Sequence, residues 1–187
     1  MKELKVKDLM IPLSDYAKVS EKATLYDAVL TLEEAQRKFD QSHYKHRSIL
    51  VYDKNHHIVG KLSQWDVIKS LEPKYDKIGD FRGISRFGLT PEFMRSMVKN
   101  YALWESPIQD VCKKAAKIKV KDIMYAPTEG EYVEEEATLN QGIHQLIVGH
   151  HQSLLVTRGK DIIGVLRLTD VFKEVCNNIK QGKMGPS

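Results

Sequence analysis

The chain has 187 residues, of which 42% are hydrophobic and 29% are charged, and these are the proportions of a folded globular protein rather than a disordered one. Its net charge of +4 suits a small anionic ligand but is too weak to indicate a nucleic-acid-binding protein. The two cysteines stand apart and no stretch approaches ~18 consecutive apolar residues, so we expect a cytoplasmic protein without disulfides or membrane spans.

Residues 1–72 are predicted to form one small unit of strands and helices. A short extended segment at Ala17–Ser20 precedes Thr24 and Asp27, whose spacing predicts a capping box at a helix start. The helix continues with apolar residues at helical spacing, at Ala28, Val29, Leu32, Ala35 and Phe39. Two apolar runs around a polar turn then predict a strand pair, followed by a second helix: the strands at Ser48–Tyr52 and Ile58–Leu62, and the helix at Gln64–Leu71.

Residues 73–117 are predicted to be a helical insertion. Thr90 as N-cap and Pro91 at the first helical position predict a helix from Pro91 to about Trp104, and a second one is expected around Pro107–Ala116. Four large apolar residues follow each other at spacings of four, four and three, which predicts burial in a core or an interface: Phe93, Met97, Tyr101 and Trp104. A dimer contact and a lid over a binding site are both open as roles for this insertion.

Residues 118–179 repeat the first unit. Val6–Met10 recurs as Val120–Met124 at an offset of 114, and Ile58–Leu62 recurs as Ile162–Leu166 at an offset of 104. The sequence therefore predicts an α+β fold of two β-α-β-β-α repeats. We expect them to pack sheet to sheet with pseudo-twofold symmetry, because neither repeat can bury its sheet alone. Residues 180–187 are predicted to form a flexible tail.

The end of each strand pair carries the chemistry. The first copy continues from Gly60 through Ser63 to Asp66, and the second from Gly164 through Arg167 to Asp170. A helix N-terminus offers unpaired N–H groups to a phosphate, and an aspartate in the first turn can accept the hydroxyls of a ribose, with a serine beside it. The spacing of Ser63 and Asp66 is also that of a helix cap. For Arg167, phosphate binding and an ion pair with a carboxylate across the module are both open.

These motifs, with the Val-Lys-Asp-Leu/Ile-Met segments and the Ala-Thr-Leu helix starts, resemble the cystathionine β-synthase (CBS) domain over residues 5–72 and 118–179. The resemblance implies a stand-alone bacterial pair of such domains that binds AMP, ADP or ATP between the repeats as a regulatory ligand and not as a catalytic cofactor. It places the base against Tyr16, Ala17, Tyr132 and Val133. It adds Lys61, His46 and Arg47 to the ligand-binding residues, the last two in position to reach a phosphate.

The predicted function is a non-catalytic module that senses an adenosyl nucleotide, forms a homodimer and signals to a protein partner. One alternative is an enzyme acting on a nucleotide, but the chain contains no P-loop, nucleophile elbow or HExxH motif. The other alternative is an adaptor that binds protein or nucleic acid through the basic inserted helices. No metal site is predicted, because adjacent histidines such as His56 and His57 point to opposite faces of a strand.

Overall fold

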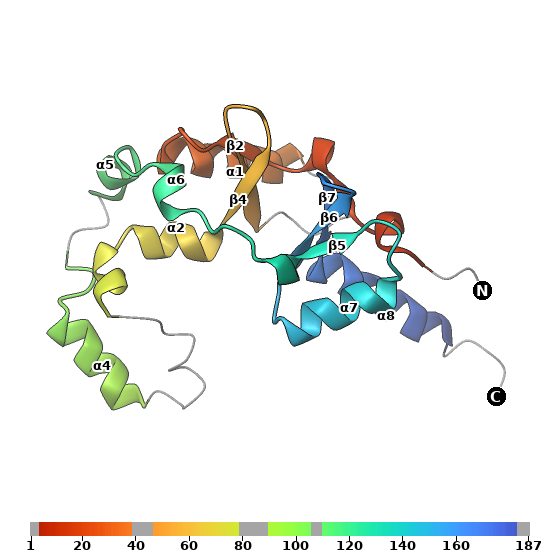
Figure 1. Cartoon of the computed structure of the whole chain (residues 1–187). Helices are drawn as coiled ribbons and strands as arrows, with labels where there is room; N and C mark the ends of the chain where they lie inside the picture. Colours follow the sequence, from red (N-terminus) through yellow and green to blue (C-terminus); the bar gives the residue numbers. More distant parts are fainter. Residues whose placement is uncertain (1–3, 39–46, 79–89, 106–109, 183–187) are drawn as a thin grey trace.

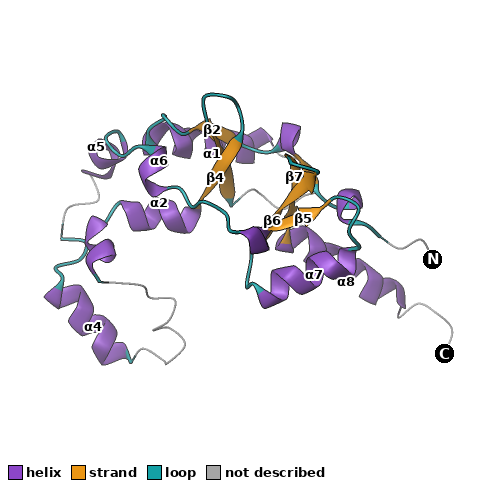
Figure 2. Ribbon diagram, viewed as in Figure 1, coloured by secondary structure: helices purple, strands orange, loops and turns teal. Residues whose placement is uncertain are grey.

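The computed structural model of the protein describes residues 4–38, 47–78, 90–105 and 110–182. Two small sheets lie at the centre of the molecule, and helices flank both of them (Figure 1). The alternation of strands and helices along the chain is the predicted α+β arrangement (Figure 2). His46, Phe39 and Pro107, which entered the sequence predictions, lie outside the described residues.

The sheet of the first repeat has three strands in the order β2-β3-β4. Its elements are β2 (Lys18–Ser20), α1 (Leu25–Lys38), β3 (Ser48–Tyr52), β4 (Ile58–Ser63) and α2 (Gln64–Ser70). β2 runs parallel to β3, and β3 runs antiparallel to β4. The predicted capping box of α1 is confirmed, because the Thr24 N–H donates to Asp27 Oδ2 (2.9 Å) and the Asp27 N–H donates to Thr24 Oγ1 (3.2 Å).

The sheet of the second repeat has four strands in the order β1-β7-β6-β5. Its elements are β5 (Tyr132–Glu134), α7 (Leu139–Val148), β6 (Ser153–Arg158), β7 (Asp161–Arg167) and α8 (Leu168–Gly182), together with β1 (Ile11–Pro12) from the start of the chain. β1 lies antiparallel to β7 at the sheet edge. α8 continues to Gly182, so residues 180–182 are helical and do not belong to the predicted flexible tail.

The segments that open the two repeats are exchanged between them. The η1 turn (Val6–Asp8) contacts the second repeat, where the Val6 N–H donates to Ala137 O (3.0 Å). Helix α6 (Val120–Ile123) contacts the first repeat in the same way, with the Val120 N–H donating to Ala23 O (3.0 Å). Val6 and Val120 are each fully buried in the core of the opposite repeat. Each hydrophobic core is therefore completed by the other half of the chain, with the predicted pseudo-twofold symmetry.

A third apolar cluster joins the two sheets. Leu50 of β3 and Leu155 of β6 hold matching positions in the two repeats, and they are 1% and 2% exposed. They pack together with Ile11, Tyr16 and Val165. Sheet-to-sheet packing, which the repeat predicted, is the arrangement in the structure.

A glycine in β4 and another in β7 make room for the exchanged segments. A Cβ atom on Gly164 would lie 2.7 Å from the carbonyl oxygen of Ile11 and 2.8 Å from Met10 Sδ. On Gly60 it would lie 2.8 Å from Met124 Sδ. In the sequence these glycines belong to the predicted ligand motif, but in the structure it is the other half of the chain that comes close to them.

Gly164→Ala is expected to lower the free energy of unfolding by about 1–3 kcal/mol, because the nearest atom is a backbone oxygen that cannot turn away. Gly60→Ala should cost less, since its nearest neighbour is the flexible end of a methionine side chain. Gly130→Ala is the matched control, because its closest atom would lie at an ordinary 4.0 Å. Urea denaturation of the three variants checks the order, and equal losses at all three positions would contradict it.

The insertion contains η3 (Pro73–Lys77), α4 (Pro91–Asn100) and α5 (Val111–Ala115). Figure 1 shows α4 at one end of the molecule, away from both sheets. It ends at Asn100 and not near Trp104, because Ala102 and Trp104 have positive φ values of 50° and 59°. Of the four residues predicted to be buried, only Met97 is buried, while Phe93, Tyr101 and Trp104 are 46%, 42% and 41% exposed. Burial in the chain's own core is therefore wrong for those three, and burial in an interface stays a prediction.

A buried carboxylate fastens the insertion to the first repeat. Glu72 is 4% exposed and accepts hydrogen bonds from the backbone N–H groups of Trp104 (2.8 Å) and Lys74 (3.3 Å). The indole of Trp104 donates to the Tyr75 hydroxyl (3.0 Å).

Within the described ranges, none of the helices combines the length and apolar character needed to cross a membrane.

Candidate functional site

Asp66 lies where β4 passes into α2, and it forms a helix cap with Ser63. The Ser63 N–H and Oγ donate to Asp66 Oδ2 at 2.8 and 2.6 Å, and the Asp66 N–H donates to Ser63 Oγ at 3.2 Å. Both side chains are partly exposed. Among the described residues, the bonds to this carboxylate reach Oδ2 only, so Oδ1 keeps the capacity to accept from a ligand. The cap and a ribose contact are therefore compatible.

The matching position in the second repeat has a different geometry. Arg167 Nε donates to Asp170 Oδ2 (2.5 Å), and Arg167 Nη2 donates to Asp170 Oδ1 (2.7 Å). Each of the two residues is 5% exposed. Of the two possibilities left open for Arg167, the structure shows the ion pair, and its partner is the aspartate three residues along the chain. Both carboxylate oxygens are occupied by charge-assisted bonds.

Tyr16 links the two repeats beside this ion pair. It is 4% exposed, and its hydroxyl lies 2.9 Å from Ser48 Oγ of the first repeat. Burial raises the pKa of Tyr16, although the hydrogen bond with Ser48 and the charge of Arg167 oppose that shift. Tyr16 is therefore a neutral hydroxyl close to the Arg167–Asp170 pair.

The other residues predicted to contact the base lie in different surroundings. Ala17 and Val133 belong to the hydrophobic cores of the first and second repeats. Tyr132 is partly buried against the cluster between the sheets, and its carbonyl accepts from Gln145 Nε2 (2.8 Å). The structure thus brings Tyr16 and Tyr132 to the interface between the sheets but turns Ala17 and Val133 into the cores.

Lys61 points to a carboxylate that the sequence analysis did not identify. Its ammonium group bonds Glu131, which is 1% exposed and also accepts from the Tyr125 hydroxyl (2.6 Å). Burial alone would raise the pKa of Glu131, but the hydrogen bonds from Lys61 and Tyr125 outweigh it and hold the pKa below its usual value. The spacing of Thr128 and Glu131 is that of a capping box and was the only sequence signal for this residue.

Arg47 is the cation nearest in sequence to β3, and it is exposed. Its carbonyl accepts from the N–H of Gln64, the first residue of α2 (3.1 Å). The backbone of Arg47 therefore lies beside the start of α2, the helix that contains Asp66.

The described residues contain no group of three His, Cys, Asp or Glu side chains able to hold a metal ion.

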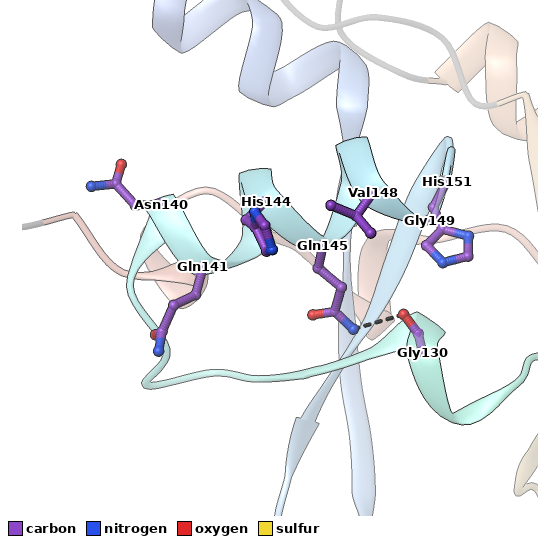
Figure 3. A pocket seen from close by; sticks show the side chains of 8 residues that line it. All are labelled: Gly130, Asn140, Gln141, His144, Gln145, Val148, Gly149 and His151. Atoms are coloured by element: carbon purple, nitrogen blue, oxygen red, sulfur yellow. Dashed lines mark hydrogen bonds between the residues drawn. The ribbon is translucent and has the colours of Figure 1, made fainter.

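A hollow of about 620 Å³ lies along α7 (Figure 3). Gln145 crosses it to donate to the Gly130 carbonyl (2.7 Å). Its lining consists of Gly130, Asn140, Gln141, His144, Gln145, Val148, Gly149 and His151. None of the residues predicted to bind a ligand contributes to it.

Known proteins resemble this chain both in the sequence of its first repeat and in the fold of the whole chain. Residues 6–73 match the family model of the CBS domain. Among curated protein sequences, none matched the chain. Solved structures match nearly the whole chain. One of them is CBSX2, a CBS-pair protein of Arabidopsis thaliana, which was solved in complex with AMP. That structure is 19% identical to this chain with a TM-score of 0.58, and the match covers 93% of this chain and 97% of that chain.

The fold is that of the CBS-pair proteins. A CBS domain-containing protein from Bacillus anthracis is 16% identical with a TM-score of 0.61, over 93% of this chain and 94% of that chain. The putative acetoin utilization protein AcuB of Vibrio cholerae is also 16% identical, with a TM-score of 0.60 over 99% of this chain and 100% of that chain. At these identities the similarity shows the CBS-pair fold, and the ligand has to be argued from the residues.

Proposed function

We propose that this chain is a regulatory module that binds an adenosyl nucleotide at Asp66. The observation that carries the proposal is the partly exposed Asp66 carboxylate at the end of β4, with Oδ1 not used by the described residues. Its support from the comparisons is the CBS domain match over residues 6–73 and the similar fold of CBSX2, which was solved with AMP.

In this proposal each residue near Asp66 has a distinct role. Asp66 Oδ1 accepts a ribose hydroxyl while Oδ2 keeps the helix cap with Ser63. The exposed guanidinium of Arg47 is the candidate partner for a phosphate. Lys61 serves a structural role instead, because its charge is already paired with the buried Glu131.

Titration calorimetry of the nucleotide-free protein with AMP, ADP, ATP, S-adenosylmethionine and NADH tests the proposal. We expect micromolar binding of at least one of them, and Asp66→Asn should weaken it by roughly 10-fold to 100-fold, the value of a hydrogen bond to a charged group. Asp27→Asn is the matched control, because Asp27 forms the same kind of cap with Thr24 at the start of α1. Intact binding in Asp66→Asn, or no binding of any of these ligands by the folded protein, would reject the proposal.

The proposed role is regulatory and not catalytic, and the nucleotide should be recovered unchanged by chromatography after incubation. Conversion of the nucleotide would favour the enzyme alternative.

We also place the protein in the cytoplasm, because the free thiols of Cys112 and Cys176 fit a reducing compartment.

We further propose that the module forms a homodimer through the outer helices. Ile68 of α2 and Phe172 of α8 hold matching positions in the two repeats and are 58% and 60% exposed. Further large apolar side chains are exposed on the same two helices, at Trp65, Val175 and Ile179, and apolar side chains that gather on an exposed helix indicate a contact surface. Light scattering at micromolar concentration should give the mass of a dimer, and Ile68→Lys with Phe172→Lys should give that of a monomer. Val98→Lys, on α4 and 52% exposed, is the comparison variant; if it alone separates the subunits, the insertion is the dimer contact.

A further inference from the structure

The two repeats share one motif but differ in how accessible their aspartates are. Asp66 and Ser63 are partly exposed, whereas Asp170 and Arg167 are each 5% exposed. Among the described residues, the carboxylate of Asp66 accepts hydrogen bonds on one oxygen, and that of Asp170 accepts them on both. A carboxylate oxygen can accept a second hydrogen bond, so it is the burial of Asp170 together with Arg167 that would oblige a sugar hydroxyl to displace the arginine.

The displacement would be unfavourable because the guanidinium is buried as well. Arg167 cannot lose its proton in a protein, so a ligand that took Asp170 would leave a buried cation without that partner. Breaking a buried ion pair costs far more than the pair contributes when it is intact. A neutral ribose hydroxyl brings no compensating charge.

Tyr16 adds to this difference. It is buried, it reaches Ser48 of the first repeat, and it lies close enough to Arg167 and Asp170 for both charges to influence its pKa. β2 and β5 hold matching positions in the two repeats and are 114 residues apart. The same offset makes Gly130 the residue that corresponds to Tyr16. The counterpart of Tyr16 is therefore a glycine, and the counterpart of Arg167 is the small residue Ser63.

We propose that the Arg167–Asp170 ion pair closes the nucleotide site of the second repeat. Each chain then binds one nucleotide, at Asp66, and the guanidinium of Arg167 permanently occupies the carboxylate of Asp170. This inference rests on the proposed function, since it names which of two similar sites works. Arg167 acts as an internal substitute for a ligand, and it decides the stoichiometry of the module.

The stoichiometry of AMP binding per chain tests the inference, measured by calorimetry and native mass spectrometry. We expect one AMP per chain in the wild type. At AMP concentrations near the wild-type Kd we expect almost none in Asp66→Asn, whose affinity should be roughly 10-fold to 100-fold lower. Arg167→Ser introduces the residue found at position 63, which can form the same cap with Asp170, and we expect it to bind two AMP molecules per chain. Arg167→Ser combined with Asp66→Asn should bind one. Arg158→Ser is the control and should still bind one AMP. It removes an arginine whose partner is the carboxylate of Glu135 and which belongs to β6, next to the strand that carries Arg167.

The possible failures are distinguishable. Two AMP molecules per wild-type chain, or one remaining in Asp66→Asn, would overturn the closed second site while leaving nucleotide binding intact, and neither result depends on whether Arg167→Ser folds. Loss of all binding in a folded Arg167→Ser protein would also overturn it, because Arg167 would then be a ligand. If no folded variant binds AMP, ADP, ATP, S-adenosylmethionine or NADH, the proposed function is rejected together with the inference. One AMP bound by Arg167→Ser and none by the wild type would reject the Asp66 site alone.

Discussion

Arg167→Met is expected to lower the free energy of unfolding by about 3–5 kcal/mol, since it leaves the carboxylate of Asp170 buried without its partner. For a chain of this size each kcal/mol corresponds to roughly 2–4 °C in Tm, so a fall of at least ~6 °C should be seen in thermal denaturation. A methionine fills much of the same volume, so a cavity is a minor part of the effect.

The double variant Arg167→Met with Asp170→Leu separates the unpaired charge from the change in packing. Replacing both members of a buried ion pair with apolar residues is often neutral, so most of the lost stability should return. Arg158→Met is the surface control, because Arg158 is 69% exposed in its pair with Glu135, and its effect should be much smaller. If Arg167→Met and Arg158→Met shift Tm equally, the burial argument fails.

Glu131→Ala is expected to have an effect of similar size, about 3–5 kcal/mol, because it leaves Lys61 and the Tyr125 hydroxyl without their buried acceptor. Lys61→Met combined with Glu131→Ala should cost less than the sum of the two single changes, since each single change already breaks the same pair. Denaturant titration of the four proteins gives the coupling. Additive losses would show that the pair does not hold the repeats together.

The same pair predicts a pH dependence. The pKa of Glu131 in the folded protein lies below its ordinary value of 4.5, so its ionised form stabilises the fold fully above that value, and this contribution disappears as the pH falls through the lower folded pKa. The wild type should therefore lose more stability than Glu131→Ala between pH 5 and the acid end of the titration. Parallel curves for the two proteins would contradict the assignment.

Much of the fold followed from the sequence, because its signals are local or repeated. The Thr24–Asp27 cap, the hairpin around Asp53 and the strands at Ser48–Tyr52 depend on residues a few positions apart. The repeat then predicted the pairing of two sheets, because a single small sheet cannot bury its face. These predictions did not require knowing which distant residues meet.

The residues around the site depended on contacts that no local pattern encodes. Lys61 and Glu131 are 70 positions apart, and nothing in either neighbourhood predicts that they pair. The exchange of Val6 and Val120 between the repeats was likewise invisible, since an apolar residue near the start of a repeat fits either core equally well. The aromatic residues of α4 show the same limit, because helical spacing predicts an apolar face but not what covers it.

The sequence by itself determined that the protein has two homologous α+β repeats, that each carries an aspartate at the start of its second helix, and that one repeat has an arginine in place of the serine. Only the tertiary structure decided that this arginine is paired with Asp170 in a buried site while Asp66 keeps one oxygen available. The reason is physical: residue type limits which bonds a side chain can make, but burial and the approach of the other repeat decide which of them it does make.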